Sequence, residues 1–368
     1  MMIGIYAKGL NPREATREFF AELFGANLIS SALLPARKAG LNQIFPALLS
    51  SKDSLDQTFP FAPVMPLSTA VQLSKITRFA NPTNTVAVLL RPCESRAAVE
   101  LVKLRQISLD NVLLITRDCP GTVEPETFEE KASDTLPGFS DFTEDDLRPV
   151  CRMCSYPEAP VADINIGTFG ADAEGGIILE AKTEKGAEIL KHIKLEAELE
   201  DTSARDAALK SETDKRTAYA DKHLAELQKE VAGIDNLIKF FAKCVNCHNC
   251  RSMCPVCYCN ECFFDSATFH FEGPRYEEWA ARRVVLQMPR DEMLFHLGRM
   301  NHIGLSCVGC GMCEQACPHD IKVGQLFALI STIAQKELDI HAGMSVTDPL
   351  PLATFREEEF TEMGEEKV

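Results

Sequence analysis

The sequence predicts an N-terminal α/β domain with parallel strands, followed by a mainly α-helical, cysteine-rich domain. Two apolar runs of strand length, Thr85–Arg91 and Asn111–Thr116, flank a helical pattern at Glu94–Gln106. A strand–helix–strand unit of this size closes right-handed with its strands parallel. In the second half, cysteines recur at fixed spacings between helix-patterned segments. The length of 368 residues is sufficient for two or three domains.

Four stretches are expected along the chain. Residues 1–180 form the α/β domain, which includes further strands at Ile3–Tyr6 and Asn27–Leu34 and a helix at Leu10–Gly25. Residues 181–240 are rich in charge and lack proline, which indicates a solvated helical linker or hairpin, or alternatively an arm that grips another subunit. Residues 241–345 form the cysteine-rich domain. The acidic residues 346–368 are expected to be a tail lying over a surface.

The cysteine-rich domain contains two copies of one motif, C-x2-C-x2-C-x3-C-P. This is the run that holds [4Fe–4S] clusters in bacterial two-cluster ferredoxins, where the fourth cysteine usually binds the other cluster. Structural zinc is the alternative, but it favours separated C-x2-C pairs. The motif therefore predicts two [4Fe–4S] clusters, with the ligands Cys244, Cys247, Cys250, Cys254, Cys307, Cys310, Cys313 and Cys317.

Helices are expected to surround these motifs. Asp291 can cap a helix that leads to Cys307, and an apolar stripe follows Pro318. The buried faces are expected to contain Met293, Leu294, Leu297 and Met300 in the first helix, and Val323, Leu326, Phe327, Ile330 and Ile333 in the second. The wide motif spacing resembles the helical ferredoxin domain of succinate dehydrogenase and heterodisulfide reductase subunits. His319 is either an exposed turn residue or a group that tunes a cluster.

A third cluster is predicted at the edge of the sheet. Cys93 and Cys119 follow the two predicted parallel strands, so both thiols emerge at the same edge, about 4.8 Å apart if the strands are neighbours. Cys151 and Cys154 add a C-x2-C pair and complete a set of four. The alternative treats Cys93 and Cys119 as small buried apolar residues.

Three cysteines remain after the first motif, namely Cys257, Cys259 and Cys262. They are one ligand short of a complete set. They could bind a further cluster with His248, His270 or a neighbouring chain as the fourth ligand, or replace Cys254 in a rearranged site. They could also be reduced thiols packed near a cluster.

The composition excludes several classes of function. A net charge of −16 argues against nucleic acid as a ligand, and it favours a protein partner with a basic patch. No apolar run reaches the roughly 18 residues that span a bilayer. With an odd number of cysteines, 15, and no recognisable signal peptide, the pattern indicates metal ligands in a reducing, anaerobic cytoplasm. No hydrolase motif or acid–base site is recognisable.

The chain resembles the beta subunits of coenzyme F420-reducing hydrogenase and formate dehydrogenase. The matching stretches are RPCESRAAVELVKL, DNVLLITRDCPGT and CRMCSYPEAPVADINIG, and they contain the four cysteines of the predicted third cluster. The resemblance implies that the α/β domain holds this cluster beside FAD, and that the flavin exchanges hydride with a deazaflavin or a nicotinamide. It also implies a ferredoxin extension like that of formate dehydrogenase-type members.

The chain departs from this family in the region expected near the flavin. Family members usually show a Gly-Gly-x-x-Thr-type stretch, whereas this chain reads LPARKAGLNQIFPALL, with Gly40 as its single glycine. No G-x-G-x-x-G occurs, so a Rossmann-type nicotinamide site is not supported. No FAD-binding residue can be assigned from a motif.

The expected function is that of an iron–sulfur electron-transfer subunit in an anaerobic oxidoreductase complex. A flavin, if bound, would divide the electron pair of a hydride carrier into single electrons for the clusters. The alternative is a flavin-free relay that connects a formate dehydrogenase, hydrogenase or heterodisulfide reductase assembly to its acceptor. In a third hypothesis the α/β domain is only a scaffold, and Cys93 and Cys119 bind nothing.

Overall fold

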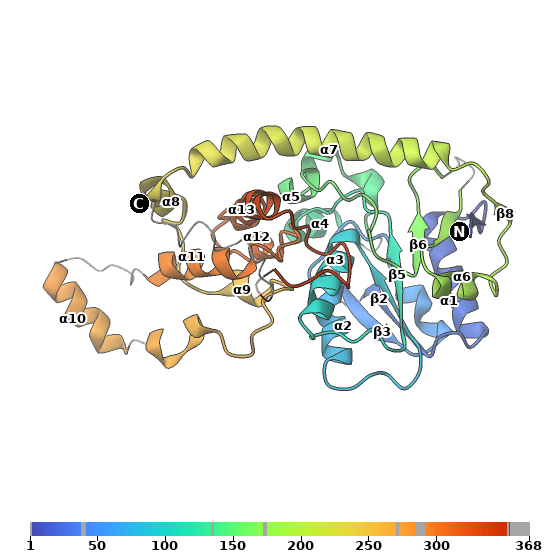
Figure 1. The fold of residues 1–368 in the computed structure, drawn as a ribbon, viewed down its shortest axis with the longest axis horizontal. Coiled ribbons are helices and arrows are strands. Elements are labelled where there is room, and N and C mark those ends of the chain that lie inside the picture. The colour runs from blue at the N-terminus through green and yellow to red at the C-terminus, as the bar shows by residue number, and fades with distance from the viewer. Residues whose placement is uncertain are drawn as a thin grey trace, which may run out of the picture.

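The computed structural model describes residues 2–37, 42–133, 136–171, 175–269, 272–284, 291–351 and 353. The N-terminal part contains one eight-stranded sheet (Figure 1). Its strands are β1 Ile3–Tyr6, β2 Ser31–Arg37, β3 Ile44–Leu49, β4 Val86–Leu90, β5 Val112–Arg117, β6 Ile164–Gly167, β7 Ile177–Ala181 and β8 Ala197–Glu198. Their order across the sheet is β3-β2-β4-β5-β6-β7-β1-β8.

The sheet is mixed, with a parallel centre. β2, β4, β5 and β6 run parallel, whereas β3, β7, β1 and β8 pair antiparallel at the two sides. The predicted strand–helix–strand unit is confirmed as β4, α3 (Pro92–Lys103) and β5, with Leu90 opposite Thr116. The predicted α/β class is therefore confirmed, and antiparallel strands extend it on both sides.

Two apolar cores cover the two faces of this sheet. On one face, Ala87 and Leu89 of β4 pack with Phe19 and Phe20 of α1 (Pro12–Gly25) and with α6 (Glu184–Leu190). On the other face, residues of β4 and β5 pack with α2 (Thr69–Thr77) and α3. Because both faces are covered, the central strands are apolar at nearly every position. The short helices α4 (Pro125–Lys131) and α5 (Pro149–Arg152) lie in the following connection.

The C-terminal part is helical and is attached to the α/β part through buried contacts. Its helices are α8 Ile234–Phe240, α9 Asn249–Ser252, α10 Gly273–Arg283, α11 Asp291–Ile303, α12 Met312–Gln315 and α13 Val323–Glu337. Val308 and Ala342 complete the core beneath α2 and α3, and Arg96 of α3 donates to both of their carbonyls. Among the described residues, no helix has both the length and the apolar character needed to cross a bilayer.

The expected apolar stripe of α11 is partly wrong. Leu294 is 52% exposed and Leu297 is 41% exposed, whereas Phe295, His296 and Arg299 are buried. The helix is rotated so that this second set of side chains faces the cysteine loops, which offer sulfur and carbonyl acceptors to the polar members. The stripe of α13 is confirmed for Val323, Leu326 and Phe327, while Ile333 is 43% exposed.

The charged segment predicted at 181–240 is not a hairpin: α6 and β8 at its start belong to the α/β part, and one long helix follows. Helix α7, Ser203–Glu230, runs along both halves of the molecule (Figure 1). Three of its four buried residues, Arg205, Arg216 and Leu227, are spaced by eleven residues, which is close to three helical turns, and the fourth, Ala220, lies about one turn after Arg216. Arg205 contacts the sheet, whereas Leu227 belongs to the core of the cysteine-rich part. The helix thus contacts both halves of its own chain.

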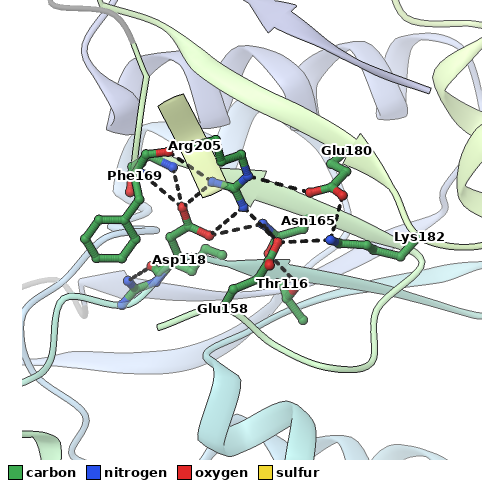
Figure 2. Close-up of polar contacts among 10 residues, drawn as sticks. Thr116, Asp118, Glu158, Asn165, Phe169, Glu180, Lys182 and Arg205 are labelled. Carbon is green, nitrogen blue, oxygen red and sulfur yellow. Dashed lines mark hydrogen bonds and ion pairs between the residues drawn. The ribbon is translucent and has the colours of Figure 1, made fainter. Parts of the chain in front are cut away.

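A buried polar network anchors the start of α7 to the sheet (Figure 2). Asp118, directly after β5, is fully buried and accepts hydrogen bonds from both Nη atoms of Arg205, at 2.8 and 3.1 Å. The same carboxylate accepts from the backbone N–H groups of Thr168 and Phe169. Glu158 also accepts from Arg205, at 2.7 Å. Removal of one partner from a buried ion pair is strongly destabilising, because the other partner is left as an uncompensated buried charge.

Asp118→Ala is expected to destabilise the protein by about 3–5 kcal/mol, because it leaves Arg205 half-paired and two backbone donors without their acceptor. The measurement is the midpoint of urea unfolding under anaerobic conditions. Asp214→Ala is the matched control, since it breaks the exposed Lys210–Asp214 pair of the same helix. That change is expected to cost less than about 1 kcal/mol. Equal midpoints for the two variants would contradict the anchoring role.

Candidate iron–sulfur centres

The four cysteines predicted for the third cluster line one pocket. Cys93 lies in the first turn of α3, Cys119 follows β5, and Cys151 and Cys154 lie in and after α5. The helix dipole of α3 favours negative charge at Cys93. We refer to Cys93, Cys119, Cys151 and Cys154 as the sheet-edge tetrad. The structure therefore brings these cysteines together at the carboxyl edge of the parallel strands, where α/β sheets commonly bind ligands.

The two ferredoxin motifs exchange their fourth cysteines. Cys317 of the second motif lines a pocket with Cys244, Cys247 and Cys250 of the first, and we call these four residues the distal tetrad. Cys254 of the first motif lies instead near the first three cysteines of the second; burial raises the pKa of each of these three thiols, and the neighbouring Cys254 raises it further. We call Cys254, Cys307, Cys310 and Cys313 the middle tetrad. This exchange is the arrangement expected of a two-cluster ferredoxin.

The two motif loops repeat the same backbone geometry. Asn246 and Gly309 occupy equivalent positions and have φ of 55° and 67°, and His248 and Gly311 have φ of 58° and 69°. Left-handed residues in such loops turn successive N–H groups toward a common centre, which forms an anion-binding concavity used by many iron–sulfur sites. In the first loop the Asn246 N–H donates to Cys244 Sγ at 3.4 Å. The loops therefore fit an anionic cluster.

The chemistry of the thiols also fits bound metal. Burial raises the pKa of Cys250 to about 11 and that of Cys310 to about 12. Thiols of this kind would be protonated at neutral pH, whereas a bound metal ion deprotonates its thiol ligands. Among the described residues, no set of three or more Cys, His, Asp or Glu side chains converges on a point suited to a single ion. A cube does not require such convergence, since each thiolate binds a different iron.

The three tetrads lie in a fixed order. Cys310 of the middle tetrad also lines the pocket of the sheet-edge tetrad, where burial first and then the neighbouring Glu94 and Cys310 raise the pKa of Cys93. The middle and distal tetrads are adjacent, because each takes cysteines from both motifs. The helices α9 and α12, one in each motif, pack against each other. The order is therefore sheet-edge, middle, distal, which reverses the order of the two motifs in the sequence.

The remaining predicted site residues lie around the middle and distal tetrads. The Cys257 side chain contacts Cys254, and Cys259 is exposed. His248 has both ring nitrogens near oxygens, at 2.6 Å from Asp265 Oδ1 and 3.0 Å from Asn246 Oδ1. His319 is exposed at the rim of the distal pocket, and Cys262 is half-buried in the surrounding core. His270 and Gly40 lie outside the described residues, as do the residues of the expected acidic tail after position 353.

Sequence reasoning missed several buried polar side chains near the thiols. His296 Nε2 lies 3.3 Å from Cys244 Sγ, and its ring stacks on Phe241 at 3.8 Å. Burial lowers the pKa of His296 to about 3, so the ring is neutral. Arg216 of α7 donates to the carbonyl oxygens of Cys119 and Cys154. The available signal was a polar pair at the i and i+3 positions among the apolar residues in the middle of α11, His296 and Arg299.

Gly311 provides a test of the close contact between the two halves. A Cβ at Gly311 would lie 2.3 Å from Val150 Cγ2, while a Cβ at the equivalent Gly309 meets nothing within 4 Å. Gly309→Ala is expected to lower the free energy of unfolding by about 1–2 kcal/mol, which is the cost of a left-handed backbone conformation for alanine. Gly311→Ala should lower the free energy of unfolding clearly more and reduce iron retention. Urea unfolding and iron analysis of the two variants provide the comparison, and equal losses would contradict this packing.

Comparison with known proteins identifies relatives for both halves. Residues 240–321 match the 4Fe-4S dicluster domain family. The F420-dependent formate dehydrogenase subunit beta of Methanocaldococcus jannaschii is 25% identical over 350 residues, covering 85% of this chain and 87% of the relative. The F420-dependent formate dehydrogenase 1 subunit beta of Methanococcus maripaludis is 27% identical over 301 residues, covering 72% of this chain and 74% of the relative.

Among solved structures, a chain of the F420-reducing [NiFe] hydrogenase complex from Methanosarcina barkeri aligns with a TM-score of 0.47 and 14% identity. The alignment covers 63% of this chain and 95% of that chain. The curated relatives match across both halves, and the domain match coincides with the two motif loops. The chain therefore carries a C-terminal 4Fe–4S dicluster domain and resembles the beta subunits of F420-dependent formate dehydrogenases, which confirms the resemblance predicted from its sequence.

Proposed function

We propose that this protein is the electron-transfer subunit of an oxidoreductase complex and that it conducts electrons through three [4Fe–4S] clusters. The observation that carries the proposal is the row of three cysteine tetrads. Cys310 belongs to the middle tetrad and also lines the pocket of the sheet-edge tetrad. Each cluster would supply one-electron transfer. The catalytic partner would be of the formate dehydrogenase or hydrogenase type that the relatives' names describe. We also propose that it works in a reducing, anaerobic cytoplasm, which is supported by fifteen cysteines that form no disulfide.

The chain's own residues would hold the clusters and keep them dry. Cys119, Cys250 and Cys313 are buried, and the cores around α3 and α13 pack directly against the loops. Cys247 is exposed, so the distal tetrad is the one that reaches the surface. We propose that a protein that exchanges electrons with the distal cluster docks there. The other end of the row, at the sheet-edge tetrad, would exchange electrons with a donor or acceptor bound at the α/β part. The direction of flow depends on the relative potentials.

A second candidate adds a flavin between a hydride carrier and the clusters. A cleft of about 470 Å³ lies between the two halves, lined by residues that include Arg96, Cys154, Tyr156 and Cys307. This volume is within the range of cofactor sites. A flavin in this cleft would lie beside the sheet-edge and middle tetrads. A deazaflavin, as in the names of the relatives, or a nicotinamide would then be the hydride carrier.

Metal and flavin analysis of anaerobically purified protein tests the two candidates. About twelve irons with about one FAD per chain would support the flavin-containing enzyme, and about twelve irons without flavin would support the relay. About eight irons would remove the sheet-edge cluster from the proposal. Reduction of the purified chain by reduced deazaflavin or NADH, followed as bleaching of the cluster absorbance, identifies the carrier; no bleaching with either carrier would contradict the flavin-containing candidate.

A further inference from the structure

Two buried arginines lie at the two junctions between neighbouring tetrads. Arg148, just before α5, is 1% exposed, and Arg299 of α11 is 2% exposed. Arg148 belongs to the α/β part of the chain, whereas Arg299 belongs to the helical part. Neither is a metal ligand, because a guanidinium has no free lone pair to donate. Each is nevertheless surrounded by cysteines from two tetrads.

Arg148 lies between the sheet-edge and middle tetrads. A Cβ placed on Gly311, inside the second motif loop, would lie 2.6 Å from Arg148 Nη2, so the guanidinium rests on that loop. Cys151 of the sheet-edge tetrad follows three residues later in the chain. A guanidinium remains protonated in proteins, so the positive charge is retained at the junction.

Arg299 lies between the middle and distal tetrads. Its Nη2 donates to the carbonyl oxygen of Cys250 at 3.0 Å, and its guanidinium lies over the Phe327 ring at 4.7 Å. Burial opposes the charge, while the thiols of Cys250, Cys254, Cys257 and Cys313 raise the pKa of Arg299. One of these cysteines belongs to the distal tetrad and two belong to the middle tetrad.

Both arginines have donors without a protein acceptor. In the part of the chain that the structure describes, all three guanidinium nitrogens of Arg148, and Nε and Nη1 of Arg299, lack a hydrogen-bond partner, although Arg148 Nε lies 3.3 Å from Glu124 and the Arg299 side chain lies beside the Cys257 thiol. Two other buried arginines near the thiols differ. Arg96 and Arg216 donate to backbone carbonyls with both Nη atoms. Buried charged donors without acceptors are costly, so we expect an anionic group to lie against them.

We infer that Arg148 and Arg299 each serve two neighbouring clusters, with Arg148 acting on the sheet-edge and middle clusters and Arg299 on the middle and distal clusters. This inference rests on the proposed function. A fixed positive charge favours the reduced form of a cluster, which carries one more negative charge, and therefore raises its reduction potential. The reduction potential of the middle cluster is raised by both arginines. The two side chains adjust the potentials of the clusters and do not themselves carry electrons.

Redox titration of the anaerobic holoprotein, followed by electron paramagnetic resonance, tests the inference. The waves are assigned by their loss in Cys93→Ala, Cys254→Ala and Cys317→Ala. Arg148→Met should shift the sheet-edge and middle waves to lower potential and leave the distal wave in place. Arg299→Met should shift the middle and distal waves and leave the sheet-edge wave in place. Arg13→Met is the control, because that side chain of α1 donates to the Thr58 carbonyl and stacks on Phe59, outside the three tetrads, and it should shift none.

Arg148→Lys and Arg299→Lys keep the charge and should show smaller shifts of the same two waves. They also preserve the test if a methionine variant fails to retain its clusters. Waves that stay at their original potentials in the methionine and lysine variants, or all three waves shifting together, would overturn the inference. Failure of the proposed function would differ, because the unsubstituted protein would then contain fewer than about twelve irons.

Discussion

Cys93→Ala should lower the iron content from about twelve to about eight atoms per chain, while the signals of the two ferredoxin clusters persist. The reason is geometric. Cys93 and Cys119 approach each other only because β4 and β5 are parallel neighbours, and both line the pocket with Cys151 and Cys154. Loss of one thiolate leaves three ligands and opens the cluster to solvent. Anaerobic iron and sulfide analysis measures the change.

Cys259→Ala is the matched control for this variant. Cys259 is an exposed cysteine of the same chain and belongs to none of the three tetrads. Its removal should leave the iron content unchanged. If Cys93→Ala also retained all its iron, the sheet-edge tetrad would not hold a cluster, and the α/β part would be a scaffold. A loss of all iron in Cys93→Ala would instead indicate general unfolding, which circular dichroism would detect.

The exchange of the fourth cysteines predicts a pattern of non-additive losses. In the structure, Cys244 and Cys317 belong to one tetrad, and Cys254 belongs to the other. The double variant Cys244→Ala/Cys317→Ala should therefore lose one cluster and keep about eight irons. The double variant Cys244→Ala/Cys254→Ala should lose two clusters and keep about four. Two changes within one site act on the same cluster, whereas changes in separate sites add.

The opposite pattern would contradict the exchange. If each motif formed its own cluster, Cys244→Ala/Cys254→Ala would lose only one cluster, and Cys244→Ala/Cys317→Ala would lose two. The three single variants are the controls, and each should lose about four irons. Cys257 contacts Cys254 and could replace it as a ligand. The double variant Cys254→Ala/Cys257→Ala is therefore also prepared. If Cys254→Ala retains its iron and the double variant loses it, Cys257 has replaced Cys254 as a ligand.

The cysteine motifs were the most visible feature of this molecule in its sequence, because the spacing within each motif is local. Apolar runs of strand length identified β4 and β5, and a helical pattern between them identified α3. The antiparallel strands β3, β7 and β8 were less visible, because pairing at the sides of a sheet is set by partners distant in sequence. The strand β8 has only two residues and no apolar pattern.

Tertiary context determined what the sequence did not reveal. The α11 helix has apolar residues on more than one face, and only contact with the cysteine loops selects Phe295, His296 and Arg299 for burial. Helix α7 looked solvated because only four of its 28 residues are buried, and two of those four are arginines. Those arginines are buried because Asp118 and the carbonyls of Cys119 and Cys154 receive them. Such partners cannot be inferred from local periodicity.

The most direct test of the central claim is the content of iron and acid-labile sulfide in protein purified without oxygen. Three tetrads of thiols, all buried or partly buried except Cys247, predict about twelve atoms of each per chain, in a brown protein that bleaches on reduction. Colourless protein that lacks labile sulfide, or protein that contains zinc in place of iron, would contradict the claim.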